Sequence, residues 1–126
     1  MEVTIAVASG YSGKTQIELI QQLSDGASPY SEGWDGGFQA LHHICIRVED
    51  VDIAVERFEQ AGLPIVMDIV SHGARYVYLD TSNGRPGGFI ELSPTSEASL
   101  ALHDKMRSLH ENWGGENPTR PFAELF

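Results

Sequence analysis

Apolar and polar residues alternate over several short stretches of the chain, and this alternation is typical of half-buried β-strands. The expected strands are residues 3–9, 15–23, 41–48, 65–70, 74–81 and 89–93. Two further stretches, 51–61 and 95–113, carry apolar residues at helical spacing. A turn is expected at residues 10–13 and a long loop at 24–37, where Gly, Ser, Asp and Pro are frequent. The pattern predicts an α+β protein.

The strand at 41–48 separates its side chains cleanly between two faces, because successive residues of a strand point in opposite directions. His42, Ile44, Ile46 and Val48 share one face, which we expect to pack under the following helix. His42 is accordingly interpreted as a packed or hydrogen-bonded histidine of the core. The other face carries His43, Cys45 and Arg47. Cys45 is interpreted as a small buried residue rather than a nucleophile.

The tripeptide Ile-Glu-Leu occurs twice, at residues 17–19 and 90–92, each time within an expected strand. Each copy places one glutamate on the face opposite its two apolar neighbours. The expected order of elements from 41 to 94 is β-α-β-β-β, and the two strands before it match the last two strands of that unit. We therefore expect a partial first module at 1–40, a complete module at 41–94, and a C-terminal helix and tail at 95–126, within one structural domain.

Composition limits the classes of function. The chain has 126 residues, a formal net charge of −10 and one cysteine. The acidic balance argues against nucleic acid and anionic membranes as partners, since both require a basic surface. No apolar stretch approaches the roughly 20 residues needed to cross a bilayer, and the N-terminal residues lack the features of a signal peptide. A reducing cytoplasm is the expected location.

Two glutamates at equivalent places in a repeated unit, with a histidine pair between them, indicate a site rather than a surface. An isolated glutamate on a strand usually faces solvent. In matched repeats, Glu18 and Glu91 are better explained as carboxylates brought to one place. His42 or His43 could then join them as a third ligand of a metal ion. The solvent-facing interpretation remains the alternative.

Three segments resemble one known family. They are residues 15–20 (TQIELI), 41–44 with 48–52 (LHHI, VEDVD) and 87–92 (GGFIEL). In order and spacing they resemble the vicinal oxygen chelate superfamily, the glyoxalase and bleomycin-resistance fold. The likeness is greatest to its glyoxalase-like and methylmalonyl-CoA epimerase-like branch. The resemblance implies βαβββ modules that form a cup-shaped mixed sheet around one divalent metal ion.

The resemblance also implies the ligands. By position in the modules they are Glu18, His43 and Glu91. The family's remaining ligand is a histidine on the first strand of the first module, and this sequence starts after that strand. The chain is therefore expected either to be truncated or to work as a reduced version with open metal positions. The incomplete cup would leave a sheet edge exposed, so a homodimer is expected.

The function implied by the resemblance is that of a metal-dependent isomerase or lyase. Its substrate would be a small carbonyl compound or thioester that reacts through an enolate-type intermediate. Oxygen ligands with one imidazole suit Mn, Co, Ni, Zn, Fe or Mg. Glu91 is the first candidate for moving the proton, and Glu18 the second. Arg47 is a candidate for binding a substrate anion, or else pairs with an acid such as Glu18.

Two other functions stay open on the same fold. Tyr76 and Tyr78 share a face of their strand and could line the cup or pack as core aromatics. Together with Tyr30 and Trp34 they would suit a non-enzymatic protein that binds a small molecule, as drug-sequestering relatives do. A ring-cleaving dioxygenase is the third candidate, although such enzymes use two histidines and one carboxylate.

Overall fold

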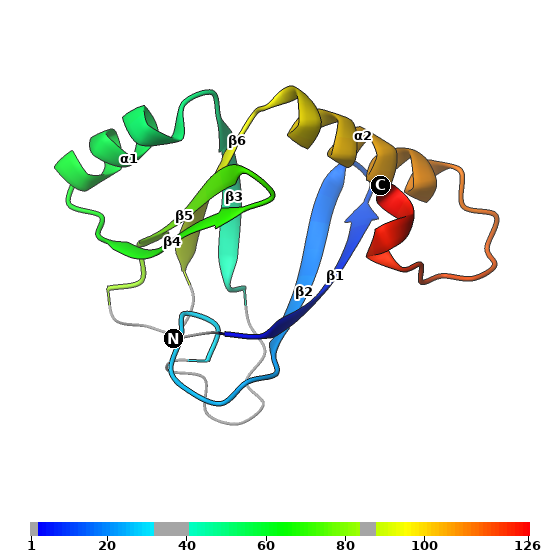
Figure 1. The fold of residues 1–126 in the computed structure, drawn as a ribbon, viewed down its shortest axis with the longest axis horizontal. Helices are drawn as coiled ribbons and strands as arrows, with labels where there is room; N and C mark the ends of the chain where they lie inside the picture. The colour runs from blue at the N-terminus through cyan, green and yellow to red at the C-terminus, as the bar shows by residue number, and fades with distance from the viewer. Residues whose placement is uncertain (1–2, 32–40, 84–87) are drawn as a thin grey trace.

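The computed structural model describes residues 3–31, 41–83 and 88–126, and it divides the strands between two sheets. The first is a two-stranded sheet of β1 (Ile5–Ser12) and β2 (Thr15–Gln22). The second has four strands, and Figure 1 shows the two sheets standing apart, with the hairpin on one side of the molecule. This arrangement is a mixed α/β fold, as the alternation pattern predicts.

The β1–β2 hairpin is longer than the sequence predicts. A turn was expected at 10–13, but β1 continues to Ser12, which pairs with Thr15. The turn consists of Gly13 and Lys14, and Gly13 has a positive φ of 61°. A glycine at the first position of a two-residue turn suits the right-handed twist of a hairpin. Glycine at position 10 does not end the strand, because it pairs in register with Ile17.

The second sheet is the expected β-α-β-β-β unit. It contains β3 (His43–Val48), β4 (Ile65–Ser71), β5 (Ala74–Asp80) and β6 (Phe89–Pro94), with α1 (Val51–Gln60) after β3. The strand order is β3-β6-β5-β4, in which β3 runs parallel to β6 and the other neighbours are antiparallel. Among the described residues, β3 therefore pairs on one side only and forms an edge of this sheet.

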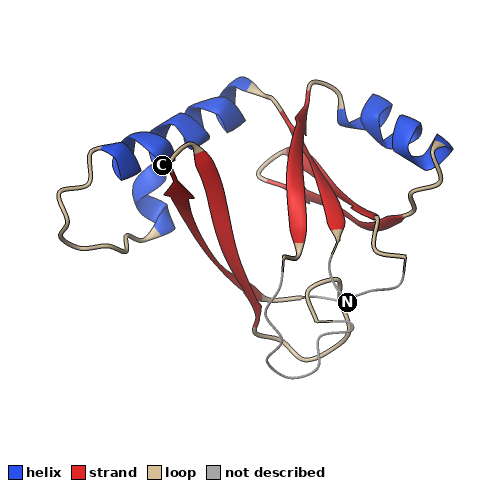
Figure 2. Ribbon diagram, turned by 180° about the vertical axis from the view of Figure 1, so that it is seen from behind, coloured by secondary structure: helices blue, strands red, loops and turns tan. Residues whose placement is uncertain are grey.

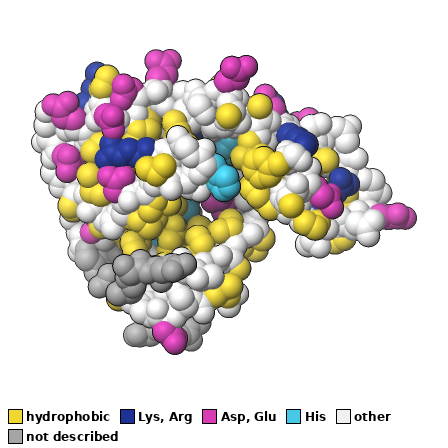
Figure 3. Space-filling model, viewed as in Figure 1, with side chains coloured by type: hydrophobic (Ala, Val, Ile, Leu, Met, Phe, Trp, Pro, Cys, Tyr) yellow, Lys and Arg dark blue, Asp and Glu magenta, His cyan; other side chains and the backbone are white. Residues whose placement is uncertain are grey.

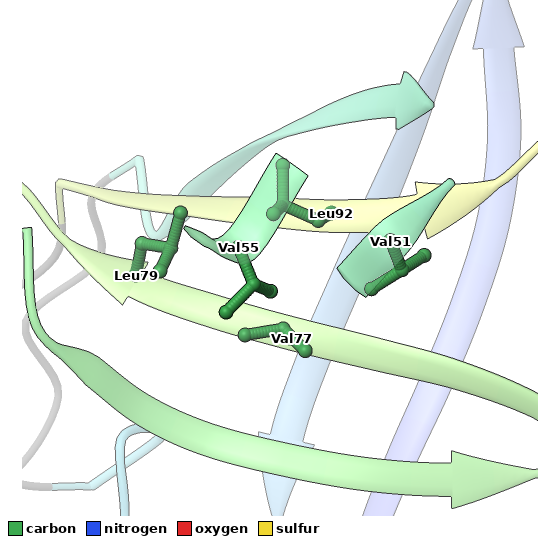
Figure 4. Close-up of a cluster of buried hydrophobic side chains, with 5 residues drawn as sticks. All are labelled: Val51, Val55, Val77, Leu79 and Leu92. Atoms are coloured by element: carbon green, nitrogen blue, oxygen red, sulfur yellow. The ribbon is translucent and has the colours of Figure 1, made fainter. Parts of the chain in front are cut away.

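Helix α1 covers the two central strands and creates the core. Asp50 caps it as predicted, since its carboxylate accepts a hydrogen bond from the Ile53 amide at 3.0 Å. The core cluster joins the helix to β5 and β6 (Figure 4) and consists of Val51, Val55, Val77, Leu79 and Leu92. Leu92, Leu79 and Val77 are fully buried.

The expectation that the apolar face of β3 packs under α1 is wrong for most of that face. Ile44 is 60% exposed and Ile46 is 38% exposed, and only Val48 packs against the core. The reason is topological. The connection from β3 to β4 must cross the whole sheet, because β6 and β5 lie between them. The helix therefore lies over β5 and β6 rather than over the strand that precedes it.

The C-terminal segment forms α2 (Glu97–Glu111) and a short 3-10 helix, η1 (Phe122–Leu125). Ser96 caps α2, which is about one turn shorter than the predicted 95–113. Figure 2 shows α2 lying across one end of the β1–β2 hairpin. The Tyr11 hydroxyl on β1 donates to the carbonyl of His103 at 3.3 Å. None of the helices in the described segments is long and apolar enough to cross a membrane.

The two Ile-Glu-Leu copies occupy equivalent places in the two sheets but have different surroundings. In the hairpin Glu18 pairs with Ser9, and in the second sheet Glu91 pairs with Tyr78. Leu92 is completely buried by α1, whereas its equivalent, Leu19, is 70% exposed. The face of the hairpin that carries Leu19 has no covering helix within the described residues. The four-stranded sheet with α1 thus has the β-α-β-β-β order, and the hairpin has two strands. The division of the chain into a partial and a complete module stays a prediction.

Candidate metal centre

Three side chains from different strands converge between the two sheets. Glu18 comes from β2, His43 from the start of β3 and Glu91 from β6, and each points away from its apolar neighbours in the strand. One ligand atom of each lies within 4.8 Å of the others. His43 Nε2 is 3.1 Å from Glu91 Oε2 and 4.0 Å from Glu18 Oε2. Figure 3 shows histidine atoms beside acidic atoms in the hollow between the sheets.

The three side chains differ in their access to solvent. His43 is 9% exposed, Glu91 13% and Glu18 35%. Burial raises the pKa of Glu18, and the charge of Glu91 raises it further, while His43 and the Ser9 hydroxyl act in the opposite direction. The Ser9 hydroxyl donates to Glu18 Oε1 at 3.3 Å. Two carboxylates held together in a partly buried place repel each other unless a cation lies between them.

The geometry fits a divalent metal ion. Ligand atoms about 2.0–2.2 Å from one ion stand roughly 3–4 Å from each other, and the two measured separations from His43 Nε2 fall in that range. Two carboxylates and one imidazole form a donor set that suits first-row divalent ions and Mg²⁺. Three protein ligands leave further coordination positions for water or substrate, as in catalytic metal sites.

His42 lies beside this cluster and not under α1. Its Nδ1 is 2.9 Å from Nδ1 of His43, and its Nε2 is 2.7 Å from the carbonyl oxygen of Pro29. The ring stacks on Tyr30, with centroids 5.1 Å apart. The interpretation of His42 as a packed, hydrogen-bonded histidine is confirmed, but its expected position on the helix face is wrong. Residue 42 precedes β3, so the alternation of that strand does not apply to it.

Tyr76 and Tyr78 lie on the same face of the second sheet as Glu91. Tyr78 pairs with Glu91 across β5 and β6, and its ring is 5.0 Å from that of His43. Burial raises the pKa of Tyr78, and the charge of Glu91 adds to that rise. Tyr78 is only 4% exposed, whereas Tyr76 is half-buried. Their roles toward a substrate stay predictions.

Tyr30 completes an aromatic group around the histidines, with its ring 6.1 Å from that of Tyr78 in an edge-on arrangement. Trp34, which the sequence places with these aromatics, lies outside the described residues. The remaining residues of the expected loop at 24–37 are described only as far as position 31.

Arg47 and Cys45 are on the same strand face as His43, as predicted, but both are exposed. The expectation that Cys45 is buried is therefore wrong. Partial desolvation of the thiol, then the charges of Glu91 and Glu18, raise its pKa to about 12, which keeps the thiol protonated. Within the described part of the chain, Arg47 forms no ion pair with Glu18. The role of Arg47 in binding an anion stays a prediction.

Sequence reasoning missed His103 on α2. Burial lowers its pKa, and the charge of Arg47 lowers it further while Glu91 raises it. His103 therefore lies within electrostatic reach of the candidate site. A signal was present, because His103 is three residues from Leu100 and three from Met106 and shares their side of the helix.

Comparisons with known proteins are consistent with this geometry. A family model described as the Glyoxalase/Bleomycin resistance protein/Dioxygenase superfamily matches residues 1–78. The match includes Glu18, His43 and the whole β1–β2 hairpin, and it ends before Glu91. A comparison with curated proteins found no match.

Proposed function

Because this chain belongs to the glyoxalase/bleomycin resistance protein/dioxygenase superfamily, we propose that it is a metal-dependent isomerase or lyase of the glyoxalase-like and epimerase-like branch. Its substrate would be a small carbonyl compound or thioester that reacts through an enolate-type intermediate. The observation that carries this proposal is the convergence of Glu18, His43 and Glu91 within 4.8 Å. The fold alone would not be sufficient, since one fold can host many functions.

The three residues would hold one divalent ion, for which Mn, Co, Ni, Zn, Fe and Mg are the candidates. Such an ion, when bound, supplies positive charge that stabilises an oxygen anion developing on the substrate. The protein's own part is to bind the substrate, exclude water and move a proton. Tyr76 and Tyr78 would form the wall next to Glu91, and Arg47 would attract a carboxylate or phosphate of the substrate.

A carboxylate of the site would carry the proton between two substrate positions. The sequence favours Glu91 for this role, whereas the geometry supports Glu18. Glu18 is the more exposed of the two, lies farther from His43, and has a pKa raised by burial and by Glu91. A carboxyl group with a raised pKa is a stronger proton acceptor at neutral pH. We therefore assign Glu18 as the first candidate and Glu91 as the second.

Metal analysis tests the proposal. The whole chain is purified without chelator, its metal content is measured, and the metal-free protein is titrated calorimetrically with Zn²⁺, Mn²⁺, Co²⁺ and Ni²⁺. We expect about one ion per chain, and loss of that binding in Glu91→Gln. Glu59→Gln is the matched control, because Glu59 is exposed on α1. No bound metal and no binding on titration would contradict the proposal.

A non-enzymatic small-molecule binding protein is the second candidate. The aromatic group of Tyr30 and Tyr78 beside the two histidines supports it, since such rings form apolar walls for ligands. Binding of an aromatic probe that persists in metal-free Glu91→Gln protein would favour this function. A ring-cleaving dioxygenase ranks third, because the cluster holds one histidine and two carboxylates.

We also propose that the protein is a homodimer. The exposed apolar residues Ile17 and Leu19 on the hairpin and Ile44 on the edge strand support it. Exposed apolar side chains on an unpaired sheet edge tend to be covered by a partner. Sedimentation velocity tests this: we expect a concentration-dependent dimer that Leu19→Lys weakens. A monomer at every accessible concentration would contradict it.

A further inference from the structure

His42 connects the candidate metal ligand His43 to the main chain through a relay of hydrogen bonds. The relay runs from the carbonyl of Pro29 to His42 Nε2, at 2.7 Å, and from His42 Nδ1 to His43 Nδ1, at 2.9 Å. At its other end, His43 Nε2 is 3.1 Å from Glu91 Oε2. Hydrogen bonds thus join Pro29, His42 and His43, and Nε2 of His43 faces the candidate metal site.

The chemistry of each group fixes where the protons lie. A carbonyl oxygen only accepts, so His42 must donate its Nε2–H to Pro29. A neutral imidazole has one N–H, so His42 Nδ1 then carries a lone pair and accepts. Its neighbour at 2.9 Å, His43 Nδ1, must therefore donate its own N–H. In neutral His43 this leaves the lone pair on Nε2, the atom that points toward the carboxylates.

Packing fixes the orientation of His42. Its ring stacks on Tyr30 with an interplanar angle of 18°, and it lies 5.0 Å from the ring of Phe89. Tilting the ring would lose these contacts, and a 180° flip of the ring would lose the bond to Pro29. The relay therefore has a defined direction set by parts of the chain outside the metal cluster.

We propose that His42 is a positioning residue that fixes the tautomer and orientation of His43, so that His43 presents the lone pair of Nε2 to the metal site. Metal-bound histidines commonly donate their other ring N–H to a fixed acceptor, which increases their strength as ligands. Here the acceptor is the adjacent histidine. The inference rests on the proposed metal-binding function, but its hydrogen bonds can be tested without metal.

The first experiment locates the proton in the metal-free protein. In ¹⁵N-labelled whole chain, NMR measures the scalar coupling across the N–H···N bond between the two Nδ1 atoms. We expect a coupling, with the proton directly bonded to His43 Nδ1. A proton bonded to His42 Nδ1, or no coupling, would overturn the inference.

The second experiment measures Zn²⁺ affinity by calorimetry in two variants. His42→Gln places an amide near Nε2, where it can still reach Pro29, but it removes the acceptor near Nδ1. His42→Asn places an amide oxygen near Nδ1 and keeps that acceptor. We expect His42→Gln to weaken Zn²⁺ binding about 10-fold or more, and His42→Asn to remain closer to wild type.

Controls separate this role from a general loss of structure. His72→Gln changes a histidine in the β4–β5 turn and should bind Zn²⁺ as wild type does. Circular dichroism and thermal unfolding establish that each variant is folded. Equal affinities of His42→Gln, His42→Asn and wild type would overturn the positioning role. No binding by wild type would instead show that the proposed metal function itself has failed.

Discussion

At the scale of single residues, Glu18 is the carboxylate of the candidate site from which we expect a pH-dependent effect on the stability of the metal-free fold. Its pKa is raised by burial and by repulsion from Glu91, so its charged form is less stable in the folded chain than in the unfolded chain. The folded state therefore binds protons more tightly at this position. That contribution to unfolding free energy becomes more unfavourable as the pH rises through and above the usual carboxyl pKa.

Glu18→Gln should therefore raise the stability of the metal-free protein while reducing metal affinity. The side chain is 35% exposed, so solvent screening limits the gain to a fraction of a kcal/mol. We expect a rise in Tm of about 1–3 °C near pH 7 and a smaller rise near pH 4. Thermal unfolding in the presence of chelator, at both pH values, provides the measurement. A lower Tm than wild type at neutral pH would contradict the argument.

Two arguments from the sequence led to the residues of the cluster: the resemblance to the superfamily implied the ligand set, and strand alternation agreed with it. Glu18 and Glu91 each stand between two apolar neighbours, and His43 is on the opposite face from Ile44. The partners of His42 could not be predicted. Its contacts with Pro29 and Tyr30 come from a loop whose path no periodic pattern describes. The exposure of Cys45 also could not be predicted, because it depends on how closely the other sheet packs against β3.

At the scale of elements, the four-stranded sheet and the β1–β2 hairpin can be compared directly. Both have an antiparallel strand pair with Ile-Glu-Leu in one strand, but α1 covers only the pair β5 and β6. The periodicity of the sequence predicted the order of the helix and the strands. It could not predict which strands the helix covers, because that depends on the crossover from β3 to β4 over the two strands between them.

Equivalent leucines in the two copies should respond very differently to truncation. Leu92→Ala removes a fully buried side chain under α1 and should lower the free energy of unfolding by about 2–5 kcal/mol. Leu19→Ala removes a side chain that is 70% exposed and should change it by less than about 0.5 kcal/mol. Urea denaturation at low protein concentration measures both. A large loss for Leu19→Ala there would mean that the hairpin face is covered within a single chain.

At the scale of the whole molecule, the candidate site is where the two sheets meet. No residue of β1 or β2 is buried, so the hairpin contributes little to the core. It contacts the rest of the chain through α2, as in the bond from Tyr11 to His103, and through Glu18 near His43. Segments with few buried contacts open at low free-energy cost. We therefore expect the hairpin to be the least protected sheet when metal is absent.

A metal ion held by Glu18, His43 and Glu91 would join the two sheets, and this leads to a prediction for hydrogen exchange. If opening of the hairpin breaks the ligand set, Zn²⁺ at 100 times its Kd should slow exchange of the β2 amides by up to about 100-fold, equivalent to about 2.7 kcal/mol. Amides of the β4–β5 turn, which contributes no residue to the ligand set, should exchange at unchanged rates. Glu18→Gln is the matched variant, because the two metal ligands that remain, His43 and Glu91, both belong to the four-stranded sheet. In that variant Zn²⁺ should leave β2 exchange unaffected. Mass spectrometry of peptides covering residues 15–22 makes the comparison. If Zn²⁺ binds wild type without slowing exchange there, Glu18 does not bring the hairpin into the metal site.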